Sequence, residues 1–376
     1  MARQWRTRRG RGAVAAALVA PALIITPVRA GPMAAWISAP PCVSWTTGAL
    51  PPSPGAVDNE LLGVSALSAC DVWAVGVYRN DNSTLLSLAE HWNGTSWKVM
   101  PTPNPSTINF LRAVSAFSPG NVWAVGDDGL ILRWNGKKWS HVASPIPGNL
   151  NGVDAVSASS AWAVGQSGNS TLVLHWNGKK WSHVASPSPG TESVLDAVTA
   201  TSAGSAWAVG AFSDGTTGKT LILHWNGRRW ARSPSPTPSG TNIEMTLDGV
   251  AATSASNAWA VGTYSNGTIQ QTIIVRWNGR AWKQASSPSP GQEPFLSGVS
   301  ATSASNAWAV GTFLAGQADE SLIEHWDGRG WKQVVGPDPG NTSSLSGVTA
   351  TSASNIWAVG TFSIGGPSQV FAIHCC

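Results

Sequence analysis

One order of apolar and polar residues recurs seven times along the chain. Each copy contains the phrase Trp-Ala-Val-Gly, and a leucine stands twelve residues before each of these tryptophans. Successive phrases begin 50, 39, 45, 52, 49 and 49 residues apart, which is typical of four-stranded propeller blades rather than of helical repeats of about 33 residues. The tryptophans that open the phrase are Trp73, Trp123, Trp162, Trp207, Trp259, Trp308 and Trp357.

Each copy begins with a short apolar segment that predicts the innermost strand of a blade. The leucine is followed three residues later by a valine, and a Gly or Ala precedes that valine in every copy. Small residues suit a position where blades crowd around an axis. In the sixth copy, a Ser-rich turn at residues 303–306 leads into a second strand, predicted at residues 307–313.

A tryptophan-flanked turn predicts that the third and fourth strands form a hairpin. Six copies read His/Arg-Trp-Asn/Asp-Gly-x-x-Trp, as in residues 175–181. Asn-Gly tolerates positive φ and is a strong hairpin signal. Whether the turn has two or four residues, its two tryptophans fall on one face of the blade. A Pro-rich exit segment such as residues 186–190 follows, and because proline cannot continue a ladder, it directs the chain to the next blade.

Tryptophan is the residue that defines the expected packing. Of the 22 tryptophans, 20 occupy repeat positions, so we interpret them as the contacts between blades. A buried aromatic ring removes roughly 150–250 Å² from water and contributes about 4–6 kcal/mol before entropy is counted. The alternative is that some rings stack on sugars, which requires them to be exposed.

The two ends of the chain are complementary parts of one repeat. The seventh copy stops at Cys376, where its third strand should turn into its fourth. Residues 42–45 and 51–55 match a fourth strand and its exit segment. We therefore expect an all-β, seven-bladed β-propeller over residues 42–376, with four-stranded antiparallel blades and a last blade completed by an N-terminal strand at residues 42–50.

The predicted closing hairpin also brings cysteines from the two ends of the chain close together. Cys376 and Cys42 would occupy adjacent positions of its turn, which predicts a disulfide contributing about 5 kcal/mol in the chain-entropy view. Cys375 is equally eligible, and Cys70 is available to pair with whichever cysteine remains, so the three possible pairings stay open. No histidine spacing supports a tetrahedral zinc site, and neither a metal nor a cofactor is expected.

The first thirty residues predict an export signal. Arginines precede an apolar stretch at residues 13–28, and Val28-Arg29-Ala30 resembles a cleavage site. A retained membrane anchor is the alternative, but it needs about 20 apolar residues. We expect residues 1–30 to be a signal peptide, residues 31–41 to be an N-terminal extension, and the mature chain to be secreted or associated with the cell surface.

Removal of this leader changes the charge. Six of the 23 basic residues lie within residues 1–30, which leaves 17 basic against 19 acidic residues, a formal charge of −2. The linear sequence then holds no basic cluster, so nucleic acid is not an expected partner. No membrane span is expected after the leader is removed.

The Trp-Ala-Val-Gly and His-Trp-Asn-Gly-x-x-Trp phrases resemble the repeats of a large group of exported bacterial β-propellers, which are distantly similar to kelch and Asp-box propellers. The resemblance covers about residues 42–376 and implies the fold without implying an activity. The chain lacks the double glycine of kelch repeats. Most copies carry Ser or Asn where an Asp-box has its aspartate.

The residues of types that could act in catalysis mostly stand at repeat positions. Tyr78 and Tyr264 stand where other copies have phenylalanine, so they are interpreted as packing residues rather than sialidase-type nucleophiles. Five histidines share one position with Arg133 and Arg276, which favours a structural role. The acids show no carboxylate pair of the kind that glycoside hydrolysis requires. No catalytic residue is predicted, and the chain is not expected to be an enzyme.

Variation among the copies indicates where a ligand would bind. The loops between second and third strands and the exit segments differ most, and both sets should emerge on one face. Just inside that face lies the residue after each starting leucine. Four of these residues are candidate ligand contacts at the channel mouth, although ordinary solvation of loops is the alternative explanation: Arg112, Asn151, Asp196 and Asp248.

The expected function is therefore a secreted binding or interaction scaffold. Its ligand would be a carbohydrate, an extracellular protein or a cell-wall component. A carbohydrate-active enzyme and a purely structural extracellular repeat protein are the two alternatives.

Overall fold

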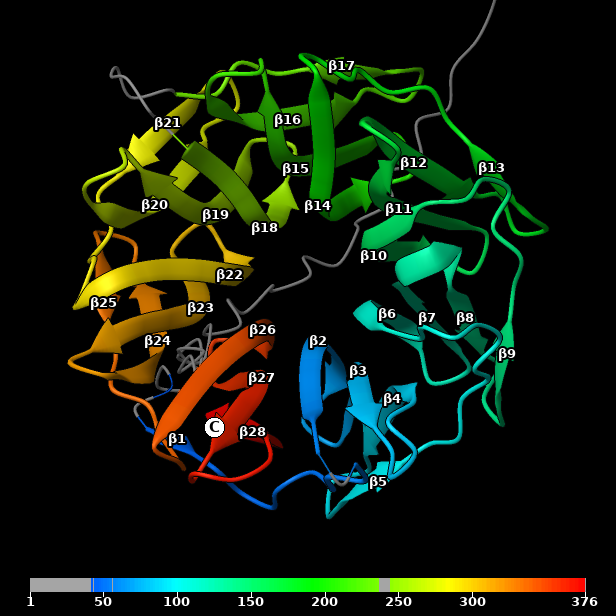
Figure 1. Ribbon diagram of the computed structural model, residues 1–376. Helices are drawn as coiled ribbons and strands as arrows, with labels where there is room; N and C mark the ends of the chain where they lie inside the picture. Colours follow the sequence, from blue (N-terminus) through cyan, green and yellow to red (C-terminus); the bar gives the residue numbers. More distant parts are fainter. Residues whose placement is uncertain (1–41, 43, 56, 237–243, 376) are drawn as a thin grey trace, which may run out of the picture. The chain divides into compact units, whose positions relative to one another are not determined.

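The computed structural model describes residues 42–375 except 43, 56 and 237–243, and contains seven four-stranded antiparallel sheets arranged in a ring (Figure 1). The seven-bladed β-propeller predicted from the repeat is thereby confirmed. The expected signal peptide (1–30), the extension (31–41) and Cys376 lie outside the described residues. Among the residues described, no helix reaches the length and hydropathy that crossing a membrane requires.

Blades 1 to 6 are each built from four consecutive strands, from the axis to the rim. In chain order they are β2 (Asn59–Ser68), β3 (Asp71–Arg79), β4 (Leu85–Trp92) and β5 (Trp97–Val99); β6 (Leu111–Ser118), β7 (Asn121–Gly126), β8 (Ile131–Trp134) and β9 (Trp139–His141); β10 (Asn149–Ser157), β11 (Ser160–Ser167), β12 (Ser170–Trp176) and β13 (Trp181–His183); β14 (Glu192–Ser202), β15 (Ser205–Ser213), β16 (Gly218–Trp225) and β17 (Trp230–Arg232); β18 (Glu244–Ser254), β19 (Asn257–Ser265), β20 (Gln270–Trp277) and β21 (Trp282–Ala285); and β22 (Gln292–Ser303), β23 (Asn306–Ala315), β24 (Ala318–Trp326) and β25 (Trp331–Gln333).

Blade 7 combines the two ends of the described chain. It contains β26 (Thr342–Ser352), β27 (Asn355–Ser363), β28 (Gln369–Cys375) and the N-terminal β1 (Trp45–Thr46), in that order. The closing strand is therefore confirmed but much shorter than the predicted 42–50. Gly48, at φ +52°, turns the chain away, and prolines follow at 51, 52 and 54, which have no N–H to donate to a ladder.

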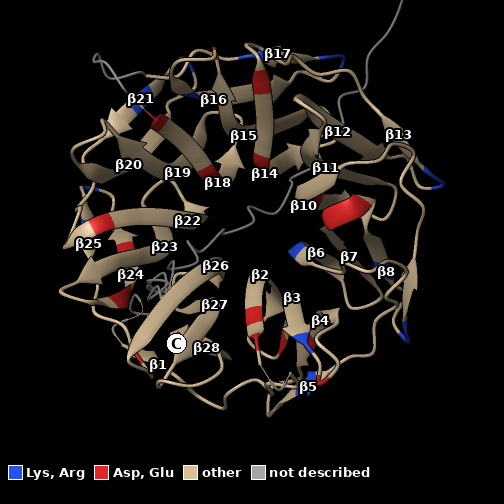
Figure 2. Ribbon diagram, viewed as in Figure 1, with Lys and Arg blue, Asp and Glu red and all other residues tan. Residues whose placement is uncertain are grey.

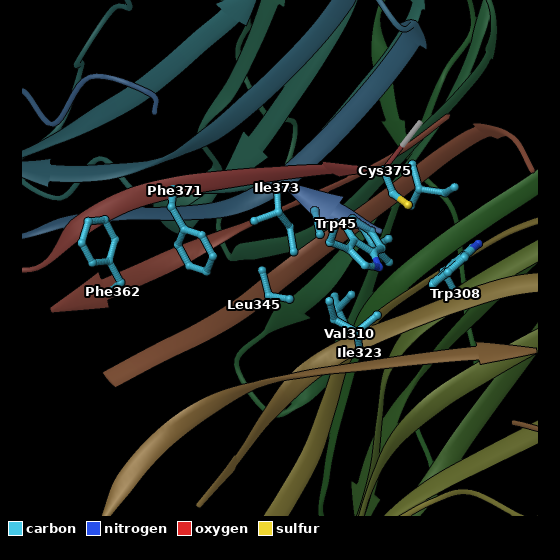
Figure 3. Packing of buried hydrophobic residues seen from close by; sticks show 12 residues of the cluster. Trp45, Trp308, Val310, Ile323, Leu345, Phe362, Phe371, Ile373 and Cys375 are labelled. Atoms are coloured by element: carbon cyan, nitrogen blue, oxygen red, sulfur yellow. The ribbon is translucent and has the colours of Figure 1, made fainter. Parts of the chain in front are cut away.

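A disulfide joins Cys42 to Cys375, with their Cα atoms 5.5 Å apart. Of the pairings that the sequence left open, the one between Cys42 and Cys375 is therefore correct. Cys375 takes the place of a third-strand tryptophan, pairs in register with Trp45 and is fully buried, so its side chain faces the closing strand (Figure 3). Cys70 is a free, exposed thiol.

Each second-strand tryptophan lies in the seam between its own blade and the next. Trp162 of blade 3 contacts Trp225 of blade 4 at 4.9 Å between ring centroids, and meets Trp230 edge-on at 5.2 Å. The same three-ring arrangement recurs at five further seams, centred on Trp73, Trp123, Trp207, Trp259 and Trp357. At the remaining seam Trp308 meets Trp45 at 5.4 Å. The prediction that these rings join the blades is confirmed.

The hairpin turn between third and fourth strands has four residues. Trp176 pairs directly with Trp181, and Asn177 Oδ1 accepts hydrogen bonds from the backbone N–H groups of Lys179 and Lys180 at 3.0 and 3.1 Å. Only the glycine of the Asn-Gly pair has positive φ, +89° at Gly178. The asparagine is therefore used for its side-chain acceptor and not for a left-handed backbone, which explains why aspartate replaces it in blade 6.

The turns separate two faces of the ring. The hairpin turns lie beside the turns between first and second strands, as shown by Trp134 Nε1 donating to the carbonyl of Pro119 at 3.1 Å. We call this side the hairpin face. On the other side, the exit segments lie beside the ends of the second strands, where the loops to the third strands begin, as shown by Ser167 Oγ donating to the carbonyl of Pro147 at 2.7 Å. We call this side the loop face, and the expectation that both variable sets share it is confirmed.

Two glutamates interrupt the apolar interior. Glu90 in β4 and Glu324 in β24 are fully buried at a position held in other blades by Leu, Val or Ile. Burial raises the pKa of both carboxyl groups to about 8. Ser287 Oγ donates to Glu324 Oε2 at 3.1 Å, whereas neither oxygen of Glu90 has a hydrogen-bond partner in the described part of the chain.

These carboxyls predict a stability that declines as pH rises. Each stays protonated in the folded state up to about pH 8, whereas the carboxyl group in the unfolded chain has its ordinary pKa of 4.5 and releases the proton there. The free energy of unfolding should therefore fall by about 1.4 kcal/mol per pH unit per group across that window. Denaturant titrations at pH 5, 7 and 9 should show that the free energy of unfolding falls less with pH in Glu90→Leu than in the wild type. At pH 9 the variant should be more stable than the wild type by a few kcal/mol. Glu90→Gln should lose the same pH slope while keeping a buried polar group. An unchanged slope in both variants would contradict the burial of an ionisable Glu90.

Candidate functional site

A β-bulge in every inner strand sets the geometry of the axial channel. In blade 3, Leu150 pairs with Gly165 and Gly152 pairs with Val164, so Asn151 is left unpaired between them. The glycine of Trp-Ala-Val-Gly is needed here because a methyl group at Gly165 would overlap the carbonyl of Asn149. The unpaired residues of the seven blades line one cavity of about 640 Å³ at the loop face: Leu62, Arg112, Asn151, Asp196, Asp248, Ser297 and Ser346.

The four candidate contact residues therefore meet in one place, which we call the channel mouth. Asn151 Nδ2 donates to the carbonyl of Leu195 at 3.0 Å and to Asp196 Oδ1 at 3.2 Å. Asp248 accepts a hydrogen bond from Thr246 Oγ1 at 2.9 Å. Blades 2, 3, 4 and 5 each contribute one of the four residues, so they form a continuous polar arc.

Arg112 has a partner that the sequence did not indicate. Its Nε and Nη2 atoms donate to Asp127 Oδ1 and Oδ2 at 2.5 and 3.1 Å. Asp127 opens a short 3₁₀ turn, η1 (Asp127–Gly129), in which Asp128 and Gly129 have positive φ. The sequence indicated a tight turn at this position. It did not reveal that the turn carries an aspartate to the channel mouth.

The two aspartates of the mouth are difficult to ionise. Burial raises the pKa of Asp196 to about 7; the nearby Asp248 charge adds to this shift, while Arg112 and the Asn151 hydrogen bond oppose it. Burial likewise raises the pKa of Asp248 to about 6, against the hydrogen bond from Thr246. A cation placed between these carboxyls would favour their ionised forms, so the mouth is electrostatically prepared for a positively charged group.

Below the mouth, a ring of seven valines separates it from a second cavity of about 260 Å³ toward the hairpin face. The residues that follow the valines bind neighbouring blades. Asp154 Oδ2 accepts from the N–H of Ala200 at 2.7 Å, and Ser115 Oγ accepts from the N–H of Ala155 at 3.0 Å. Burial raises the pKa of Asp154 to about 6, against the hydrogen bonds that its carboxylate accepts from Ala200 N–H, Ser115 Oγ and Ala155 N–H. We assign this second ring of polar residues to the contacts between blades.

The five histidines at the repeat position lie in the seams rather than in the mouth. His175 stacks on Trp162 with ring centroids 4.3 Å apart, and its Nε2 is 3.1 Å from Ser160 Oγ. Arg276 occupies the same position over Trp259, with its Cζ 4.7 Å from the ring centroid. Burial lowers the pKa of His175, as it does for three of the equivalent histidines. Their structural role, inferred from the repeat, agrees with this packing.

No tryptophan of the described chain offers an exposed platform for a sugar. Every tryptophan at a repeat position is buried or half-buried, and none is among the exposed large apolar side chains of the described chain. Tyr78 and Tyr264 pack against the cores of blades 1 and 5. The packing interpretation of these aromatic residues therefore has direct support, whereas stacking on sugars does not.

No family profile matches the chain, and no curated protein matches it. Solved structures do share its fold. The structure of YCF48 bound to D1 peptide has a TM-score of 0.55 at 18% identity, and the match covers 88% of this chain and all of that one. The WD40 propeller domain of Doa1 gives 0.57 at 13% identity over 88% and 96% of the two chains. The GH74 xyloglucanase from Xanthomonas campestris gives 0.55 at 13% identity over 87% of this chain and 55% of that one. At these identities the similarity establishes the β-propeller fold alone.

Proposed function

We propose that the protein is an extracellular interaction scaffold whose channel mouth binds an extended protein segment bearing a lysine or arginine side chain. The observation that carries the proposal is the convergence of Asp196 and Asp248 in one cavity at the loop face. Both carboxyls have raised pKa values and so gain from a nearby cation. Arg112 is already held by Asp127, which leaves it less able to satisfy them.

The surroundings of the mouth suit a peptide. Exposed apolar side chains lie in the variable loop-face segments, including Ile108, Ile269, Phe295 and Ile364. A basic side chain in the cavity and apolar side chains on the loops would give a segment both a charged anchor and burial. At the level of fold, the peptide complex of YCF48 gives a precedent for this use of a propeller.

The extracellular location and the resemblance to exported propellers with kelch-like or Asp-box-like repeats are parts of the same proposal. A disulfide between Cys42 and Cys375 is of the kind that persists in an oxidising compartment. Export guided by residues 1–30 would place the chain there.

The test is selection from a random peptide library with the mature chain, followed by measurement of Kd by fluorescence anisotropy. Selected peptides should be enriched in Lys or Arg, and Asp196→Asn/Asp248→Asn should weaken their binding at least about tenfold, or 1.4 kcal/mol. Binding should strengthen from pH 5 to pH 8, because the aspartates with pKa values of about 7 and 6 ionise over that range, and the double variant should lose this dependence.

The matched control is Asp128→Asn, which removes an exposed acidic group on the same face next to the Arg112 partner. Its peptide affinity should stay within about twofold of the wild type, since surface charges contribute little. Peptides without basic residues, or equal losses in the double variant and the control, would count against the proposal.

A carbohydrate-active enzyme is the second candidate, because two carboxyls with raised pKa values share one cavity. Such a pair is the minimum equipment of a glycoside hydrolase. Release of reducing ends from plant and bacterial polysaccharides, abolished by either single Asp→Asn substitution, would replace the scaffold proposal with this one. We expect no release.

A further inference from the structure

The hairpin turns and outer strands hold most of the basic residues outside the leader. Twelve of those 17 residues lie there, and all twelve are exposed. Figure 2 shows the blue segments at the periphery, beside β13, β17 and β21. The residues, from blade 1 to blade 6, are Lys98; Lys137 and Lys138; Lys179 and Lys180; Arg228, Arg229 and Arg232; Arg280 and Lys283; and Arg329 and Lys332.

Acidic residues are nearly excluded from the same segments. Within these turns and outer strands Asp327 is the only acid, and it pairs with Lys332 at 2.6 Å. The acids lie mainly in the channel, the inner strands and the loop-face segments, as Figure 2 shows for β14, β18 and β22. These basic residues form no cluster in the sequence, because each blade contributes only one to three of them. The turns of blades 2 to 4 each contribute two basic residues and those of blades 5 and 6 contribute one each, and the repeat places these turns on one side of the ring.

The hairpin turns do not need basic residues in order to form. The blade 1 turn reads Asn93-Gly94-Thr95-Ser96, and Asn93 Oδ1 accepts from the N–H groups of Thr95 and Ser96 at 3.0 Å each. The blade 2 turn has the same two bonds at 3.0 Å, to Lys137 and Lys138. Folding of the hairpin therefore does not account for five consecutive blades carrying basic residues at the same place.

We propose that this basic rim, defined by the twelve residues above in blades 1 to 6, binds a linear acidic polysaccharide. The clusters sit on separate blades around a convex edge, so one small anion cannot contact them together, whereas a flexible polyanion can follow the arc. Several weak charge contacts along one polysaccharide chain together strengthen its binding, through avidity and through the release of counterions.

Two other polyanions fit the rim less well. Single-stranded nucleic acid needs exposed aromatic rings on which bases stack, and the described tryptophans of these hairpins are buried or half-buried. An anionic bilayer is usually bound with the help of apolar side chains that enter it. Of the exposed large apolar residues of the described chain, only Val99 of β5 lies in the hairpin turns or outer strands of blades 1 to 6, and a single valine provides little apolar surface to enter a bilayer.

The experiment measures the binding of a fluorescein-labelled heparin decasaccharide to the mature chain in about 0.1 M NaCl. The test variant changes blades 2 to 4 to the blade 1 turn: Lys137→Thr, Lys138→Ser, Lys179→Thr, Lys180→Ser, Arg228→Thr and Arg229→Ser. Because blade 1 already folds with this sequence, the hairpins should be retained, and near-UV circular dichroism checks this. The six changes should weaken binding at least about tenfold and reduce the slope of log Kd against log salt concentration.

Two double variants distinguish the effect of where the basic residues lie from the effect of a change in net charge. Lys137→Thr/Lys138→Ser and Arg79→Gln/Lys219→Gln each remove two charges, the second pair from the loop face, where Arg79 and Lys219 are bound to Asp58 and Asp214. Only the first pair should weaken heparin binding, by about twofold to fivefold. Absence of heparin binding, equal losses in both pairs, or tighter binding to phosphatidylglycerol vesicles or to single-stranded DNA would overturn the proposal. Peptide binding at the channel mouth should be unchanged in the six-residue variant, so the two sites can fail independently.

Discussion

Trp162→Ala should lower the free energy of unfolding by about 4 kcal/mol, measured by denaturant titration at pH 7. The ring is 1% exposed and lies between His175 of its own blade and Trp225 and Trp230 of the next. Its removal takes away apolar burial and leaves a cavity at a seam that no neighbouring side chain can reach across, and large-to-small changes of this kind cost about 3–5 kcal/mol.

Substitutions at other positions distinguish the loss of seam packing from the effect that any substitution has on stability. Trp162→Phe keeps a ring in the seam and should cost about half as much, whereas Val99→Ala in the exposed outer strand β5 should cost less than about 0.5 kcal/mol. If Trp162→Ala cost no more than Val99→Ala, the seam tryptophans would not be the principal contacts between blades.

The second large effect concerns the closure of the ring. Cys42→Ala should lower the free energy of unfolding by about 3–5 kcal/mol under oxidising conditions. The disulfide links residues 333 positions apart in sequence, and a cross-link over so long a loop restricts the unfolded chain strongly. The strand it secures, β1, has only the two residues Trp45 and Thr46, so backbone pairing alone holds it weakly.

The free thiol provides the control for this experiment. Cys70→Ser changes an exposed cysteine outside the bridge and should leave stability within about 0.5 kcal/mol of the wild type. Reductant should destabilise the wild type and Cys70→Ser but not Cys42→Ala. Peptide mapping without reduction should recover residue 42 linked to residue 375; a bridge through Cys70, or equal stabilities of Cys42→Ala and wild type, would contradict the latch.

The architecture was predictable because the chain repeats it seven times. A single Trp-Ala-Val-Gly phrase would indicate only a strand, but seven phrases at blade spacing, with an incomplete last copy, determine the number of blades and their closure. The pairing through Cys375 was not predictable, because it depends on the register that places Cys375 opposite Trp45 in the folded blade.

The residues of the candidate site could be predicted from the sequence, but their interactions could not. Alignment of the copies placed Arg112, Asn151, Asp196 and Asp248 at equivalent positions, but the bulge that leaves them unpaired in their ladders and the approach of Asp127 to Arg112 depend on backbone geometry. The two buried glutamates were visible in the aligned copies, since Glu90 and Glu324 stand where other blades have aliphatic residues. The basic rim emerges only when separate turns are brought to one side of a ring.

Hydrogen exchange with and without a selected basic peptide tests the central claim, that the channel mouth is the ligand site. Bound peptide should slow exchange in the first halves of β10, β14 and β18, where Asn151, Asp196 and Asp248 lie, and in the neighbouring loop-face segments. Protection confined to the hairpin turns or to the outer strands β13, β17 and β21 would place the peptide on another surface and contradict the account.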